Sequence, residues 1–292
     1  MTRTLITGIN GQLGQELQRV LSSVANLELI GVGRDRMDLS QPSTIRSIVA
    51  EIQPEIIINS GAYTAVDKAE SEPELAHAIN GIAPGILAEE AQKLDATLIH
   101  VSTDYVFDGT QSHPYQETDP THPIGIYGAS KLAGEQAIQA TNARAIILRT
   151  AWVYGVGGTG NFVKTMLRLG ADRPELRVVA DQIGSPTWTG DIANAIAGLI
   201  AQHRDLSGIY HFTNSGVASW YDFAVAIFEE AAQLGFPLKI DRVVPITTPE
   251  YPTPAKRPAY SVLAGQKIAS VLESPAPHWR YSLRKMLAEL KG

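Results

Sequence analysis

A tyrosine and a lysine four residues apart, Tyr127 and Lys131, offer the clearest chemistry in the sequence. On a helix this spacing places both side chains on one face. A ketone that is reduced by hydride develops alkoxide character and needs a proton. A tyrosine can supply it if a nearby ammonium favours the phenolate and lowers the tyrosine pKa from about 10 toward neutrality. The pair therefore predicts acid catalysis of carbonyl reduction, whereas the alternative is an ordinary amphipathic pair.

A hydroxyl group stands at the end of a predicted strand before this pair. Residues 97–102 have the pattern of a buried strand, and Thr103 and Asp104 follow it. Ligands bind at the carboxyl ends of strands in open parallel sheets. We therefore expect Thr103 to orient a substrate carbonyl beside Tyr127, with Asp104 also facing the substrate. The alternative for Thr103 is a hydroxyl that caps a turn.

Three glycines recur at every third position near the start of the chain, between a predicted strand and a predicted helix. Glycines allow a tight turn and a close approach of the backbone to a ligand. The amides at the start of the helix can then bind a pyrophosphate, which the helix dipole favours. The spacing G-x-x-G-x-x-G differs from the G-x-G-x-x-G of most dehydrogenases, yet its position predicts dinucleotide binding. The expected cofactor contacts in this turn are Gly8, Asn10, Gly11, Gln12, Leu13 and Gly14.

The residue after the second predicted strand bears on the choice of cofactor. A carboxylate there binds the ribose 2′-hydroxyl of NAD, whereas an arginine accommodates the 2′-phosphate of NADP. Arg34 occupies the region where an acid would stand, with Asp35 just beyond it. The sequence thus favours NADPH over NADH, and the alternative for Arg34 is a solvated surface side chain.

The elements that must position these residues alternate regularly in the first half of the chain. Strand patterns lie at 4–7, 27–32, 55–59, 97–102 and 145–150, and helical patterns include 72–94 and 126–139. Such repeats imply parallel strands with right-handed crossovers. The predicted fold is α/β, a Rossmann-like doubly wound parallel sheet with a smaller C-terminal α/β lobe. Residues 1–150 would bind NAD(P), and residues 151–292 would mainly bind substrate, with some later segments returning to the sheet.

The second half of the chain is less regular. A sixth strand is predicted at 176–179, and helices at 189–201, 219–233 and 282–290. Five prolines between residues 245 and 258 predict an extended loop.

Composition narrows the classes of function. The chain has 292 residues, a net charge of −6 and no cysteine, which excludes disulfides and zinc–cysteine sites. It has no dense basic cluster for nucleic acid and no apolar run near the roughly 18–20 residues of a membrane span, and we expect no secretory signal. We expect a cytoplasmic monomer or homodimer. No metal site is expected; Glu16 is a conceivable ligand for a divalent ion such as Mg²⁺, without a complete site around it.

The glycine turn, Thr103, and Tyr127 with Lys131 resemble the extended short-chain dehydrogenase/reductase superfamily. More closely, the chain resembles the dTDP-4-dehydrorhamnose reductase family. The similar segments keep their order through nearly the whole chain, at 62–70, 102–109, 126–135, 149–154, 161–169, 181–187 and 251–258.

This resemblance implies that NADPH or NADH reduces the C4 ketone of dTDP-4-dehydro-L-rhamnose to dTDP-L-rhamnose. It implies that Tyr127 protonates the oxygen, that Lys131 tunes Tyr127 and binds the nicotinamide ribose, and that Thr103 orients the carbonyl. Gln12, with its neighbours Gly11 and Leu13, would lie against the pyrophosphate. The remaining cofactor contacts would be Ala62, Tyr63 and Thr64 after the third strand, with Asp38 and Leu39 beside the adenine. The alternative for Asp38 and Leu39 is a helix cap or a loop.

The substrate contacts follow from the resemblance with alternatives left open. Trp152 would stack on or wall the sugar, or else pack in the core. Arg257 would pair with the nucleotide diphosphate, or else be a surface charge.

Two other functions compete with the reductase. One is a nucleotide-sugar epimerase or dehydratase of the same superfamily. Dehydratases resemble this chain but have a glutamate where Tyr105 stands, which disfavours dehydration. The other is a non-catalytic NADP-binding regulatory subunit of methionine adenosyltransferase, against which the complete set of Thr103, Tyr127 and Lys131 argues.

Overall fold

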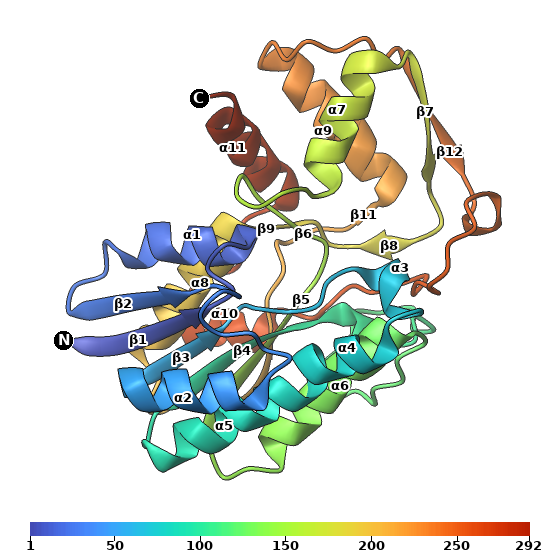
Figure 1. Ribbon diagram of the computed structural model, residues 1–292. Helices are drawn as coiled ribbons and strands as arrows, with labels where there is room; N and C mark the ends of the chain where they lie inside the picture. Colours follow the sequence, from blue (N-terminus) through green and yellow to red (C-terminus); the bar gives the residue numbers. More distant parts are fainter.

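Short runs of β-branched residues form the central sheet of the computed structural model, which describes residues 1–292. Ile56, Ile57 and Ile58 are fully buried because helices cover both faces of their strand. The six strands are all parallel (Figure 1), in the order β2 (Leu27–Val32), β1 (Thr2–Thr7), β3 (Ile56–Asn59), β4 (Thr97–Thr103), β5 (Arg144–Thr150) and β10 (Gly208–His211). The chain order reverses between β1 and β3, and ligands of open α/β sheets bind at such a point.

Helices cover the sheet in two layers. Successive strand residues point to opposite faces, so Leu5 packs in one layer and Ile6 in the other. The Ile6 face is covered by α1 (Gln12–Leu21), α8 (Thr189–Ala201) and α10 (Gln266–Leu272). The Leu5 face is covered by α2 (Pro42–Ile52), α5 (Ala83–Lys93) and α6 (Ile126–Gln139). A π-helical segment, η1 (Ala78–Ile82), joins α5 to α4 (Pro73–His77), which packs against α6.

A smaller lobe has a core of its own, with Phe223, Ile227 and Leu283 at its centre. Figure 1 shows its three helices at the top, apart from α2 and α5 at the bottom. They are α7 (Phe162–Asp172), α9 (Trp220–Gln233) and α11 (Trp279–Lys291). Its strands pair as β6 (Val153–Tyr154) with β9 (Thr187–Trp188), β8 (Ile183–Gly184) with β11 (Ala218–Ser219), and β7 (Glu175–Val179) with β12 (Arg242–Ile246). Single turns form at α3 (Val66–Ala69), η2 (Asp104–Val106) and η3 (Thr248–Glu250).

The predicted parallel α/β sheet is confirmed, and so are the helices at 126–139 and 189–201. The strand predicted at 176–179 is confirmed as β7, which pairs with β12 in the lobe and not with the central sheet. The sixth strand of the central sheet is β10, which the sequence analysis missed. This edge strand has only four residues and begins at a glycine, so it lacks a strand-like pattern.

The proline-rich segment departs in part from the extended loop predicted for 245–258. Its first two residues, Pro245 and Ile246, complete β12, which pairs with β7 alone. Proline is tolerated there because one edge of β12 is free of a partner strand. Among the helices of the structure, none combines the length and apolar character that crossing a bilayer requires.

Candidate active site

A cavity of about 870 Å³ opens at the carboxyl ends of β1 to β5. This size is ordinary for a small-molecule or cofactor site. The structure brings most of the predicted site residues to its lining: Gly8, Asn10, Gly11, Gln12, Leu13, Arg34, Asp38, Leu39, Ala62, Tyr63, Thr64, Thr103, Asp104, Tyr127, Lys131 and Trp152. Gly14 and Arg257 are the two predicted residues that do not line it.

The glycine turn is shaped by close contacts that only glycine allows. Gly8 has a φ of 68°, and a Cβ on it would lie 2.6 Å from the Cα of Gly61. A Cβ on Gly14 would lie 2.3 Å from the carbonyl oxygen of Gly8, so Gly14 packs α1 against the turn instead of facing a ligand. No side chain caps the start of α1, and its first turn has no acidic residue. The first amides of α1 are therefore free of side-chain competition for an anion.

Two side chains after β2 form an exposed ion pair at the edge of the cavity. The Nε of Arg34 lies 3.4 Å from Oδ2 of Asp38. The pKa of Asp38 is lowered, first by hydrogen bonds from Ser40 and then by Arg34. Because the Arg34 side chain is 76% exposed, its guanidinium can leave this pair for a stronger anion.

The segment after β3 is fixed by an asparagine that the sequence analysis missed. Asn80, in η1, accepts a hydrogen bond from the amide of Tyr63 and donates one to its carbonyl, both at 2.9 Å. It also donates to the hydroxyl of Ser130 in α6. Asn80 thus holds the cofactor-facing loop against the helix that carries Tyr127. No local pattern marks this residue, since its partners are far away in sequence.

Tyr127 and Lys131 lie on one side of α6, as predicted, but their protonation differs from the prediction. Burial raises the pKa of Tyr127 to about 12, against the influence of the neighbouring Thr103 hydroxyl. Burial lowers the pKa of Lys131 to about 8, opposed by the charge of Glu135. The expectation of a lowered tyrosine pKa is therefore wrong for this structure, because burial outweighs the hydrogen bond with Thr103. Tyr127 is a protonated phenol at neutral pH.

The carboxyl group of Asp104 is buried next to Thr103. Its Oδ1 accepts a hydrogen bond from the Thr103 hydroxyl at 3.1 Å, while Oδ2 has no hydrogen-bond partner. Burial raises the pKa of Asp104 to about 6. Because Oδ2 has almost no exposed surface, direct contact of Asp104 with a substrate stays a prediction.

The lobe contributes an aromatic wall. Trp152 adopts a left-handed backbone conformation with a φ of 49° and stacks on Trp220, with ring centroids 3.5 Å apart. Trp220 in turn donates from Nε1 to Oε1 of Gln182 at 3.2 Å. The sequence analysis missed Trp220. The capping box of Ser219 and Asp222 marks it as the first residue of a helix, but not as a neighbour of Trp152.

Arg257 lies behind the lining, in an ion pair. Its guanidinium donates to Oδ2 of Asp67 at 2.8 Å, and the amide of Ala255 donates to Oδ1 of the same carboxylate. Arg257 is the main cause of the lowered pKa of Asp67. The pair ties the loop before Pro258 to the segment after β3, next to the cavity. Contact of Arg257 with a diphosphate stays a prediction.

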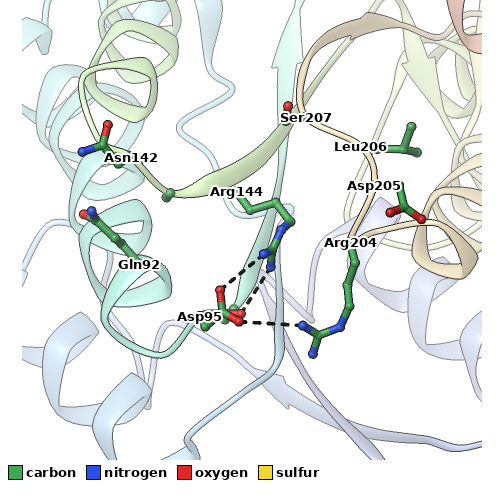
Figure 2. Close-up of a pocket in the computed structure, with 10 residues that line it drawn as sticks. Gln92, Asp95, Asn142, Arg144, Arg204, Asp205, Leu206 and Ser207 are labelled. Carbon is green, nitrogen blue, oxygen red and sulfur yellow. Dashed lines mark hydrogen bonds and ion pairs between the residues drawn. The ribbon is translucent and has the colours of Figure 1, made fainter.

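A second hollow, of about 470 Å³, lies at the opposite end of the sheet, near the start of β5. Figure 2 shows the guanidinium groups of Arg144 and Arg204 turned toward the carboxylate of Asp95. With Asp205 also in the lining, the hollow holds two positively and two negatively charged side chains. This balance gives no preference for a phosphate.

Glu16, the conceivable metal ligand, is paired with Arg19 in the next turn of α1. The structure contains no group of three histidine, aspartate or glutamate side chains that could hold a metal ion.

Comparisons with known proteins agree over the whole chain. The RmlD substrate binding domain family matches residues 2–291. A dTDP-4-dehydrorhamnose reductase of Burkholderia thailandensis is 43% identical, over 99% of both chains. The crystal structure of dTDP-4-dehydrorhamnose reductase from Bacillus anthracis in complex with NADP is 40% identical, with a TM-score of 0.92 over 99% of this chain and 100% of that one.

A UDP-glucose 4-epimerase of Thermus thermophilus, in complex with NAD, shares the fold at 21% identity, with a TM-score of 0.82 over 100% of this chain and 99% of that one. At this identity the likeness extends to the fold alone. The full-length matches at 40% identity or more are specific: the chain belongs to the RmlD substrate binding domain family, the family of the dTDP-4-dehydrorhamnose reductases.

Proposed function

We propose that the protein reduces the C4 ketone of dTDP-4-dehydro-L-rhamnose with NADPH to form dTDP-L-rhamnose, with NADH as a weaker alternative. One observation carries this proposal: Thr103, Tyr127 and Lys131 meet the uncapped start of α1 in a single cavity at the carboxyl edge of the sheet. In this proposal residues 1–150 bind the dinucleotide, and the lobe within residues 151–292 binds the nucleotide sugar.

The residues of the cavity fit a dinucleotide phosphate. The free amides at the start of α1 suit a pyrophosphate, and the exposed guanidinium of Arg34 suits a 2′-phosphate. Asp38 and Leu39 would flank the adenine. Ala62, Tyr63 and Thr64 would line the rest of the dinucleotide. When bound, NADPH supplies the hydride.

The side chains of the protein supply position and a proton. In our proposal the Thr103 hydroxyl orients the ketone, and the protonated Tyr127 gives its proton to the oxygen as the carbon receives the hydride. The phenolate left behind is stabilised by the Lys131 ammonium. The products are the alcohol and NADP⁺, and one proton from solvent restores the tyrosine.

Tyr105 supports reduction over dehydration. Burial raises its pKa above the ordinary value of a tyrosine, and its ring packs edge-on against Tyr127 at 5.4 Å. A neutral phenol cannot replace the carboxylate that elimination of water needs at this position.

The test is oxidation of NADPH by the purified protein with dTDP-4-dehydro-L-rhamnose, with NADH run in parallel. We expect substrate-dependent turnover that is faster with NADPH. Arg34→Ala should weaken the binding of NADPH more than the binding of NADH, because only NADPH carries the 2′-phosphate. An equal loss of affinity for both cofactors would refute the role of Arg34. Tight NADP binding without turnover would favour an epimerase or a regulatory subunit.

A further inference from the structure

Three buried polar side chains lie in one row beneath α6. Thr7, Asn59 and His100 are paired across neighbouring strands, Thr7 with Asn59 and Asn59 with His100. Each is at most 1% exposed. By the alternation along each strand, all three point to the sheet face that α6 covers. A row of this kind in an otherwise apolar layer requires its hydrogen bonds to be matched internally.

The row is connected at both ends. The amide of Gly61 donates to Oγ1 of Thr7 at 3.2 Å, and Oγ1 of Thr7 lies 2.7 Å from Oδ1 of Asn59. Nδ2 of Asn59 lies 2.9 Å from Nδ1 of His100. Nε2 of His100 lies 3.4 Å from Nζ of Lys131. These contacts form a chain of hydrogen bonds that runs from the loop after β3, which would line the cofactor, to Lys131.

The donors and acceptors along this chain of hydrogen bonds follow from its first contact, between Gly61 and Thr7. A backbone N–H can only donate, so the Thr7 hydroxyl accepts from Gly61 and has its own proton for Asn59. The Asn59 oxygen accepts it, and the amide nitrogen then donates to Nδ1 of His100. With Nδ1 as acceptor, a neutral imidazole carries its proton on Nε2. The reverse direction would leave the Thr7 proton without an acceptor.

We propose that this chain of hydrogen bonds presents the Nε2–H of a neutral His100 to Lys131, so that the Lys131 ammonium releases its proton more readily to become the amine. His100 is then a positioning residue that acts through Lys131. The geometry at Nζ suits an amine, which can donate to the carbonyl oxygen of Val101 at 2.7 Å and accept from His100 with its lone pair.

The charged groups around His100 and Lys131 agree with a neutral His100 that donates from Nε2. From α6, Glu135 favours the ammonium of Lys131, but Arg149 of β5 binds that carboxylate in a buried ion pair. Tyr127 of α6 is a neutral phenol. β1 and β3 contribute only the uncharged Thr7 and Asn59. Burial and the nearby Lys131 hold the pKa of His100 well below its usual value, so the imidazole is neutral.

For the reaction, the consequence rests on the proposed function. An ammonium that releases its proton near neutral pH can return one to the Tyr127 phenolate after each turnover and then regain it from water. The lowered pKa of Lys131 strengthens the drive for this transfer, because the phenol of Tyr127, with a pKa of about 12, holds a proton more tightly than the ammonium does.

The test is the tautomer of His100 and the titration of Lys131 in the full-length protein without cofactor. Long-range ¹H–¹⁵N correlation of ¹⁵N-histidine distinguishes the two tautomers, and ¹³Cε shifts of labelled lysine follow its titration. His100→Gln and Lys131→Arg identify the signals. We expect the Nε2–H tautomer, without protonation between about pH 5 and pH 9, and a pKa of Lys131 of about 8.

Thr7→Val removes the hydroxyl that sets the direction and keeps the shape of the side chain. Asn59 can then reverse, His100 can move its proton to Nδ1, and the pKa of Lys131 should rise by about one unit. Thr4→Val is the matched control, since Thr4 is a buried threonine of the same strand on the opposite face. An Nδ1–H or cationic His100 in the unmodified protein would overturn the proposal, whether or not Thr7→Val folds.

Identical tautomer and lysine titration in Thr7→Val and Thr4→Val would overturn it as well. Neither measurement involves turnover. A result that overturns the proposed chain of hydrogen bonds is therefore distinguishable from a failure of the proposed reductase activity.

Discussion

The two walls of the cavity are built in different ways. On the sheet wall, Thr103 ends β4, and Tyr127 and Lys131 share one helix, so short local segments determine their places. On the lobe wall, Trp152 meets Trp220, and behind the lining of that side Asp67 meets Arg257 across 190 residues of sequence. The sheet wall is therefore fixed by secondary structure, whereas the lobe wall depends on how separate loops come together.

The ion pair behind the sheet wall is also more deeply buried than the ion pair on the lobe side. Behind Thr103, the ion pair of Arg149 and Glu135 is 2% and 1% exposed, and the Ser102 hydroxyl also donates to Glu135. The pair of Arg257 and Asp67 is 21% and 41% exposed. Solvent weakens an ion pair and also reduces the cost of breaking it. We therefore expect the sheet wall to be rigid and the lobe wall to be adjustable.

The largest effect should come from breaking the buried ion pair. Glu135→Gln leaves the Arg149 charge buried without a carboxylate, which should lower the free energy of unfolding by about 3–5 kcal/mol. Asp67→Asn, the equivalent change on the lobe wall, should cost about 1 kcal/mol or less. Urea denaturation of both variants measures the difference. Equal losses would contradict the proposed contrast between the walls.

The next effect concerns catalysis on the sheet wall. Tyr127→Phe removes the proposed proton donor and should lower kcat by roughly 10² or more, with NADPH affinity unchanged. Tyr105→Phe is the control, because it removes the hydroxyl of the neighbouring tyrosine in the cavity lining and should cost less than about tenfold. Steady-state rates and cofactor titration measure both. A Tyr127→Phe variant with a nearly normal rate would mean that the proton comes from another group.

The contrast between the walls also explains what the sequence could predict. Thr103, Tyr127, Lys131 and the glycine turn lie in segments whose strand–turn–helix pattern is local, and their meeting follows from parallel strands ending at one edge. Trp220 and Asn80 escaped prediction because their partners are distant in sequence. β10 escaped because a four-residue edge strand has too few residues for a pattern. The raised pKa of Tyr127 escaped because burial is a property of the assembled fold.

The third effect is a pH dependence of stability from Asp104. Its pKa is about 6 in the folded protein against 3.8 for an ordinary aspartate, so folding disfavours the ionised form. This cost is absent below about pH 4 and complete above about pH 6. Relative to Asp104→Asn, the wild type should lose between about 2 and 3 kcal/mol of stability across that window as the pH rises.

Urea denaturation at several pH values tests this dependence. Asp108→Asn is the control with the opposite sign, because hydrogen bonds from Thr110 lower the pKa of Asp108 in the folded protein. Parallel pH profiles for the wild type and Asp104→Asn would show that the carboxyl of Asp104 is solvated and not buried.

The smallest effect tests the adjustable wall. Trp220→Leu removes the ring on which Trp152 stacks, an interaction of about 0.5–1.5 kcal/mol, so KM for the nucleotide sugar should rise by up to about tenfold. Trp220→Tyr keeps an aromatic face and should have the smaller effect. In both variants kcat and NADPH affinity should change little, because neither tryptophan contacts the proton donor. A fall in kcat that matches the rise in KM would mean that the lobe positions the ketone as well as the sugar, and the two walls would then act as one unit.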